Sequence, residues 1–100
     1  MNITFEYDNL KSSERLEELI TKKLNKLESK FDFLVQAHVF LKVQNTSSPL
    51  FGKICKIQLS VPGPRLFAET NSKSFEASIQ ETISDLDRQL SKKKEKMKAH

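Results

Sequence analysis

The chain of 100 residues holds 17 lysines and arginines against 13 aspartates and glutamates, with 37% hydrophobic and 30% charged residues. This length and composition are typical of one globular domain spanning 1–100, and no apolar run approaches the ~18 residues of a membrane span. The N-terminus lacks the basic and apolar regions of a secretory signal. The lone cysteine, Cys55, excludes an internal disulfide and fits a reducing compartment. We therefore expect a cytoplasmic protein.

The positive charge is concentrated at the C-terminal end. Residues 1–87 hold 11 lysines and arginines against 12 aspartates and glutamates, whereas residues 88–100 hold six against one. Such asymmetry favours a polyanionic partner, either nucleic acid or an anionic membrane surface. The simpler interpretation is a solvated helix end, where cations lie near the negative pole of the helix dipole.

The N-terminal half predicts a strand, a helix and a second strand. Apolar residues alternate with polar ones at Ile3, Phe5 and Tyr7, which indicates a short strand. Ser12 or Ser13 can cap a helix over 13–31, where apolar residues recur at three- and four-residue steps. Residues 35–44 alternate again and predict the second strand. Its inward-facing residues are Val35, Ala37, Val39, Leu41 and Val43.

The C-terminal half predicts two more strands and a second helix. A loop over 45–49 leads to the third strand, and the turn 62–64 (Pro-Gly-Pro) leads to the fourth. The inward-facing residues of these strands are Cys55, Ile57, Leu59, Val61, Leu66, Ala68 and Thr70. The second helix covers roughly 73–97, with Met97 at the end of its apolar stripe. Its N-cap candidates are Asn71, Ser72 and Ser74.

The predicted order is therefore β-α-β-β-β-α. A strand–helix–strand start implies a right-handed crossover between parallel strands, and the next two short junctions suit antiparallel neighbours. Each helix has one apolar stripe, so we expect an α+β two-layer sandwich, with a four-stranded mixed sheet and both helices on one face. The predicted core consists of Leu16, Ile20, Leu24, Leu27, Val39, Leu41, Ile57, Leu59, Phe75, Ile79, Ile83 and Leu86.

No catalytic, metal or cofactor pattern is found in the sequence. Cys55 shares the strand parity of buried residues, which favours a structural thiol over a nucleophile. His38 and His100 are the two histidines and lie far apart, so they make a poor metal site. Gly52 and Gly63 are the two glycines and provide no phosphate-cradling loop. The sequence therefore predicts neither an enzyme nor a small-molecule substrate.

Basic side chains on the two predicted helices repeat every four residues. On the first helix, Lys22, Lys26 and Lys30 form one stripe, with Lys23 beside it. The stripe of the second helix, in the basic segment 88–100, consists of Arg88, Lys92 and Lys96, widened by Lys93, Lys94 and Lys98. If both helices cover one face of the sheet, the two stripes border a single groove. Paired cationic stripes bind a phosphate backbone without reading its sequence.

The outward face of the predicted sheet carries Phe40 and Phe67 among basic residues. Aromatic rings among cations on a sheet can stack unpaired bases, although the glycine- and aromatic-rich motif of RNA-binding sheets is missing. The alternatives are a protein contact or ordinary exposed apolar surface.

Three segments give the chain a family resemblance. They are 22–31 (Lys-Lys-Leu-Asn-Lys-Leu-Glu-Ser-Lys-Phe), 39–43 (Val-Phe-Leu-Lys-Val) and 83–96, where Arg-Gln-Leu precedes alternating lysines. Over essentially all 100 residues the chain resembles a short form of the ribosome hibernation-promoting factor family. That family includes the ribosome-associated translation inhibitors and the sigma-54 modulation proteins.

The resemblance implies a non-enzymatic factor that binds the small ribosomal subunit between head and body. It would occlude the channel of messenger and transfer RNA, inhibiting translation in starvation or stationary phase. Whether ribosome pairing needs a second hibernation factor stays open. By position, ribosomal RNA contacts fall to Lys22, Lys23, Lys26, Lys30, Arg88, Lys92, Lys93, Lys94 and Lys96, to which we add Lys98.

Two other functions fit the residues. One is a general structured-RNA-binding module with the shape of a double-stranded-RNA-binding domain. The other is a protein-interaction module that works through Phe40 and Phe67. Binding that ignores salt would favour the protein-interaction module, because phosphate contacts release counterions.

Overall fold

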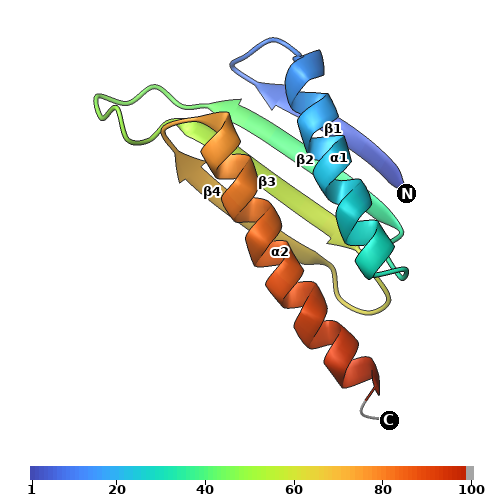
Figure 1. Ribbon diagram of the computed structural model, residues 1–100. Helices are drawn as coiled ribbons and strands as arrows, with labels where there is room; N and C mark the ends of the chain where they lie inside the picture. Colours follow the sequence, from blue (N-terminus) through green and yellow to red (C-terminus); the bar gives the residue numbers. More distant parts are fainter. Residues whose placement is uncertain (99–100) are drawn as a thin grey trace.

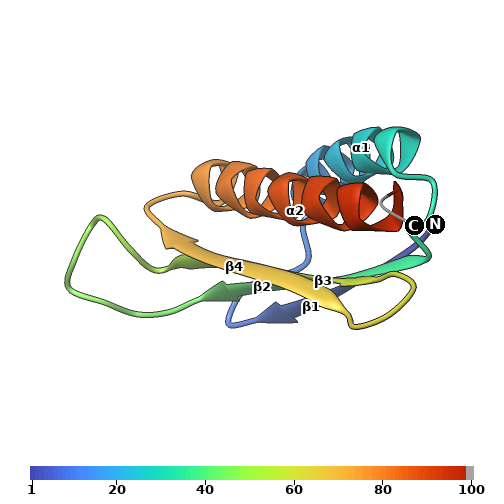
Figure 2. The ribbon, with the colours of Figure 1, turned by 90° about the horizontal axis from the view of Figure 1, so that it is seen from below.

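The structure, a computed structural model, describes residues 1–98, so His100 lies outside the described residues. Its elements are β1 (Asn2–Asp8), α1 (Glu14–Lys30), β2 (Gln36–Val43), β3 (Lys53–Ser60), β4 (Leu66–Ser72) and α2 (Phe75–Lys98). Figure 2 shows both helices on the same face of the sheet, while no element of residues 1–98 covers the other face. The predicted two-layer α+β sandwich with the order β-α-β-β-β-α is confirmed.

The sheet has the strand order β1-β2-β3-β4. β1 pairs with β2 in parallel, and β3 pairs antiparallel with both β2 and β4. The register places Phe5 beside Val39, Val39 beside Ile57 and Ile57 beside Ala68. A row of apolar side chains therefore crosses the sheet on the face that the helices cover, as the alternation of the strands requires.

Both helices begin at a serine cap. The Ser13 hydroxyl accepts a hydrogen bond from the Leu16 amide at 3.2 Å, and the Ser74 hydroxyl accepts one from the Ala77 amide at 3.2 Å. These bonds satisfy amides that have no partner within the first turn, which fixes where each helix starts. Figure 1 shows that the two helices run side by side in the same direction, so their C-terminal ends lie at the same end of the molecule.

The core lies between the helices and the sheet. Its fully or nearly fully buried apolar residues include Ile20 and Leu24 of α1, Leu41 and Ile57 of the sheet, and Ile79 of α2. The predicted core residues are buried with one exception. Phe75 is half-buried and packs against the margin of the core, because it is the first residue of α2 and lies at the end of the helix.

Two further expectations about buried residues are wrong. Val35 is 61% exposed because β2 begins one residue later, and the neighbouring Leu34 is buried instead. Met97 is 48% exposed. Figure 1 shows the reason, since the last turns of α2 extend past the end of the sheet. The apolar stripe of this helix therefore continues beyond the surface that it covers.

None of the helices within residues 1–98 has an apolar stretch long enough to cross a membrane.

Candidate nucleic-acid interface

The lysines of α1 point to two different sides of the helix. Lys22 and Lys26 are exposed and line a shallow hollow on the outer side of α1, which they share with Glu14 and Glu18. Lys23 instead faces α2, where its Nζ donates to Gln80 Oε1 at 2.6 Å. The stripe predicted from spacing therefore winds from the outer surface of α1 toward its neighbour helix.

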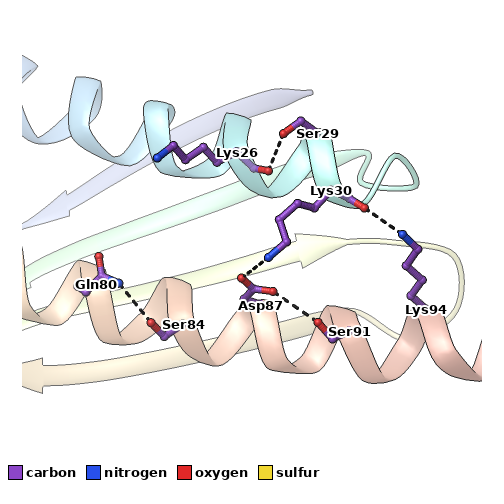
Figure 3. Close-up of polar contacts among 8 residues, drawn as sticks. All are labelled: Lys26, Ser29, Lys30, Gln80, Ser84, Asp87, Ser91 and Lys94. Atoms are coloured by element: carbon purple, nitrogen blue, oxygen red, sulfur yellow. Dashed lines mark hydrogen bonds and ion pairs between the residues drawn. The ribbon is translucent and has the colours of Figure 1, made fainter.

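Lys30 is the last residue of α1 and also reaches α2. Its Nζ lies 2.8 Å from Asp87 Oδ2 and forms an ion pair with it. The ammonium group also lies 5.5 Å from the centroid of the Phe31 ring, within the range of a cation–π contact. Lys30 is therefore held at the boundary between the two helices, as Figure 3 shows.

The cations of α2 are divided in the same way. Arg88 and Lys92 line a hollow on the outer surface of the helix together with Ser84, Asp87 and Ser91. Lys96 is exposed. These side chains belong to the part of α2 that faces solvent.

Lys93 lies apart from both groups. Its side chain is half-buried, three residues after the core residue Leu90 of α2. There its ammonium group lies beside the turn that joins β3 to β4, so close that a Cβ on Gly63 would be 3.3 Å from Nζ. Sequence spacing placed Lys93 among the widening residues of the stripe, but the structure separates it from them.

Cations from both helices meet in a hollow of about 450 Å³ between the helix ends, which we call the interhelical notch. It is lined by Lys30, Phe31, Ser91, Lys94, Glu95 and Lys98. Lys94 Nζ lies 5.7 Å from the Phe31 ring centroid and donates to the Lys30 carbonyl oxygen at 3.4 Å (Figure 3). That carbonyl belongs to the last turn of α1, where a cation is favourable because the helix dipole is negative.

The predicted single groove between the two stripes is thus only partly present. Lys30 and two lysines of α2 share the notch, whereas Lys22, Lys26, Arg88 and Lys92 face solvent on the outer sides of their helices. Nearer the start of the helices, the interhelical seam is bridged by Arg15 with Glu76 and by Lys23 with Gln80. The result is a cationic surface that wraps around the C-terminal ends of both helices.

The seam contacts also show what sequence reasoning missed. Arg15 Nη1 lies 3.0 Å from Glu76 Oε1. The pKa of Glu76 is lowered, first by a hydrogen bond from its own backbone amide and then by the one from Arg15. Asp87 of α2 pairs with Lys30 of α1, a lysine 57 positions away along the chain. Lys23 and Lys30 are seven residues apart, and so are their partners Gln80 and Asp87. This equal spacing on the two helices was the signal in the sequence.

Cys55 is a buried free thiol. Burial raises the pKa of the Cys55 thiol to about 12, so it is protonated at neutral pH. Among residues 1–98 there is no group of three or more His, Cys, Asp or Glu side chains that could hold a metal ion.

The uncovered face of the sheet carries the predicted aromatic residues. His38 and Phe40 are stacked, with ring centroids 5.4 Å apart, and Lys56 Nζ lies 5.4 Å from the centroid of Phe40. Phe67 is 61% exposed. Glu69 pairs in register with Lys56, so acidic and basic side chains are mixed on this face, in contrast to the cationic helix ends.

These features define a class: a small α+β protein whose two parallel helices present a cationic surface at their shared C-terminal end. The chain belongs to the family described as sigma 54 modulation protein / S30EA ribosomal protein, which matches it over residues 3–98. It is 33% identical to the ribosome hibernation promoting factor of Escherichia coli K12 over 100 residues, covering all of both chains. The Salmonella typhimurium protein of the same name is 32% identical, again over the full length of both.

Solved structures support the same assignment. A ribosomal subunit interface protein from Coxiella burnetii superposes with a TM-score of 0.81 and 26% identity, covering 94% of this chain and 98% of that one. The N-terminal domain of Thermus thermophilus Protein Y superposes with a TM-score of 0.77 and 22% identity, over 92% of this chain and 98% of that one. The second likeness shows that the fold is shared.

Proposed function

We propose that this protein is a ribosome hibernation factor. It binds the small ribosomal subunit through ribosomal RNA, lies in the channel that messenger and transfer RNA otherwise use, and inhibits translation in starvation or stationary phase. Two kinds of finding support this function. One is full-length similarity to hibernation promoting factors, and the other is the cationic surface at the helix ends.

The single observation that carries the RNA contact is the gathering of cations from two helices at one end of the molecule. Lys30, Lys94 and Lys98 line the notch, and Arg88 and Lys92 extend the positive surface over α2. Lysine and arginine side chains on exposed helix faces bind phosphates through charge and counterion release, which positions a protein without reading base sequence. An RNA assembly of fixed shape is therefore a suitable partner.

Inhibition by this protein requires no catalytic step. The folded body measures 50 × 24 × 19 Å, and it would exclude other ligands from the space in which it is bound. The mixed charge of the uncovered sheet face, where Lys56 lies between Phe40 and Glu69, makes it a weaker RNA-binding surface than the helix ends. We therefore assign the anchoring role to the helices and the steric role to the whole body.

Competition on isolated small subunits tests this function. Transfer RNA bound to the subunit should be displaced by the protein, and the displacement should weaken as salt is raised. Simultaneous binding of transfer RNA and this protein would contradict occlusion. Equal affinity for subunits and for a plain RNA duplex would indicate a general structured-RNA binder instead, and binding that ignores salt would indicate a protein-interaction module.

Two further experiments address translating ribosomes in the cell and the pairing of ribosomes. Sedimentation of ribosomes from starved cells, with and without this protein, should show fewer translating ribosomes when it is present. Adding a second hibernation factor to purified ribosomes and this protein then tests whether pairing needs that factor.

A further inference from the structure

One of the ten cations assigned to RNA binding already forms an ion pair with a carboxylate of the protein itself. Within residues 1–98, Lys30 is the only one of the ten that forms an ion pair, and its partner is Asp87 at 2.8 Å. The side chains are partly exposed, 56% for Lys30 and 35% for Asp87, so the pair lies at the surface, where an RNA phosphate can reach it. Figure 3 shows the Asp87 carboxylate between the lysine and the hydroxyl of Ser91.

Asp87 lies at the boundary between two groups of cations. On one side it contributes to the outer hollow of α2 with Arg88 and Lys92. On the other side its lysine partner belongs to the interhelical notch, with Lys94. A carboxylate and a phosphate both offer anionic oxygens at hydrogen-bond distance from an ammonium group. Asp87 therefore holds Lys30 as a backbone phosphate would.

On the basis of the function proposed above, we infer that Asp87 is an internal counter-ion that limits the affinity of this protein for RNA. In the free protein it occupies Lys30, and when RNA binds, a phosphate takes its place on the lysine. Exposed ion pairs are individually weak and contribute little to folding, so this exchange is permitted. Residue 87 then sets affinity without itself binding RNA.

The test measures binding of Asp87→Asn to isolated small subunits. We expect this variant to bind about two- to fivefold more tightly than the wild type, because the competing charge on Lys30 is gone. The matched control is Asp85→Asn, which changes the net charge equally. Asp85 accepts a hydrogen bond from Gln89 Nε2 at 3.1 Å and forms no ion pair among residues 1–98. The control variant should gain clearly less affinity for small subunits than Asp87→Asn does.

A second pair of variants shows whether the gain acts through Lys30. In a Lys30→Met background, Asp87→Asn should give no more improvement than Asp85→Asn, because the cation that Asp87 occupies is absent. A gain that persists in this background would overturn the inference, since it would reflect net charge alone. Thermal unfolding of each variant shows whether a change in affinity comes from a folding defect.

The remaining outcomes also decide the matter. Weaker binding by a folded Asp87→Asn variant would show that the ion pair is a brace that positions the helices, which overturns the inference. Equal affinity of Asp87→Asn and Asp85→Asn would overturn it as well, while leaving the proposed function intact. If the wild-type protein fails to bind small subunits at all, the proposed function fails and this inference with it.

Discussion

Thr82 of α2 is joined to Cys55 of β3 by a buried hydrogen bond, in which the threonine Oγ1 lies 3.2 Å from the cysteine carbonyl oxygen. The same hydroxyl lies 3.0 Å from Thr70 Oγ1 on β4. Because a hydroxyl has a single proton, Thr82 donates to the carbonyl and accepts from Thr70. One side chain thus connects the long helix to two strands and fixes how α2 is rotated over the sheet.

Replacing this hydroxyl by a methyl group should weaken the fold. In Thr82→Val the shape is nearly kept, but Thr70 loses a buried partner, so we expect the free energy of unfolding to fall by about 1–3 kcal/mol. Urea denaturation measures this change. Thr82→Ser keeps the hydroxyl and should retain more of the stability than Thr82→Val does. A valine variant as stable as the wild type would show that the bond contributes nothing.

Truncation of core side chains should lower the free energy of unfolding more than Thr82→Val does. Leu41 and Ile79 are 1% and 0% exposed and lie on opposite layers of the core. Leu41→Ala or Ile79→Ala should each lower the free energy of unfolding by about 2–5 kcal/mol, because a cavity is left where the side chain was. Phe67→Ala is the control, since its ring is mostly exposed. An equal loss in all three variants would contradict the proposed core.

Cys55 should behave as a buried structural residue. Its pKa is raised by burial to about 12, so the reactive thiolate is scarce in the folded protein at neutral pH. We expect slow reaction with a thiol reagent until denaturant is added, and Cys55→Ala should keep small-subunit binding. Because the folded pKa exceeds the unfolded one, this group stabilises the fold fully below about pH 9 and progressively less as pH rises toward 12. A folded alanine variant that loses activity would contradict this role.

Salt dependence should report the number of phosphate contacts. If about six of the ten cations touch ribosomal RNA, the logarithm of the affinity should fall with the logarithm of the salt concentration at a slope of roughly −4 to −5. Filter binding or sedimentation at several salt concentrations measures this slope. A slope near zero would exclude binding by phosphate contacts.

Charge reversal should separate the cationic surface from general electrostatics. Lys22→Glu with Lys26→Glu, or Lys92→Glu with Lys96→Glu, should weaken small-subunit binding by at least about tenfold and relieve inhibition of cell-free translation. These side chains are exposed, so each double variant should stay folded.

The matched control for these variants reverses Lys11 and Lys73. Both are exposed, and they precede α1 and α2 at the other end of the helical layer. The control has the same net charge as either double variant, so it should lose much less affinity if the helix ends carry the contact. An equal loss of affinity in the control and in the two double variants would show that Lys22, Lys26, Lys92 and Lys96 are only an ordinary solvated helix surface.

Sequence by itself determined the local structure of this protein. The alternation around Val39 and Leu41 predicted β2, and the apolar steps after Ser13 predicted α1, because both signals depend on neighbours a few residues apart. Strand order followed from connection lengths and handedness. The ten cations were identified from their helical spacing and from the family resemblance, and their role in RNA binding stays a prediction.

Only the tertiary structure decided where those cations lie and what they contact. Lys22 and Lys30 belong to one stripe in sequence, yet the first faces solvent and the second pairs with Asp87 on the other helix. Such a contact depends on the rotation and offset of two helices that pack on one core, in which Leu24 and Leu86 are both fully buried. Because spacing within one helix contains no information about its neighbour, the notch and the Lys30–Asp87 pair form only when the whole chain is folded.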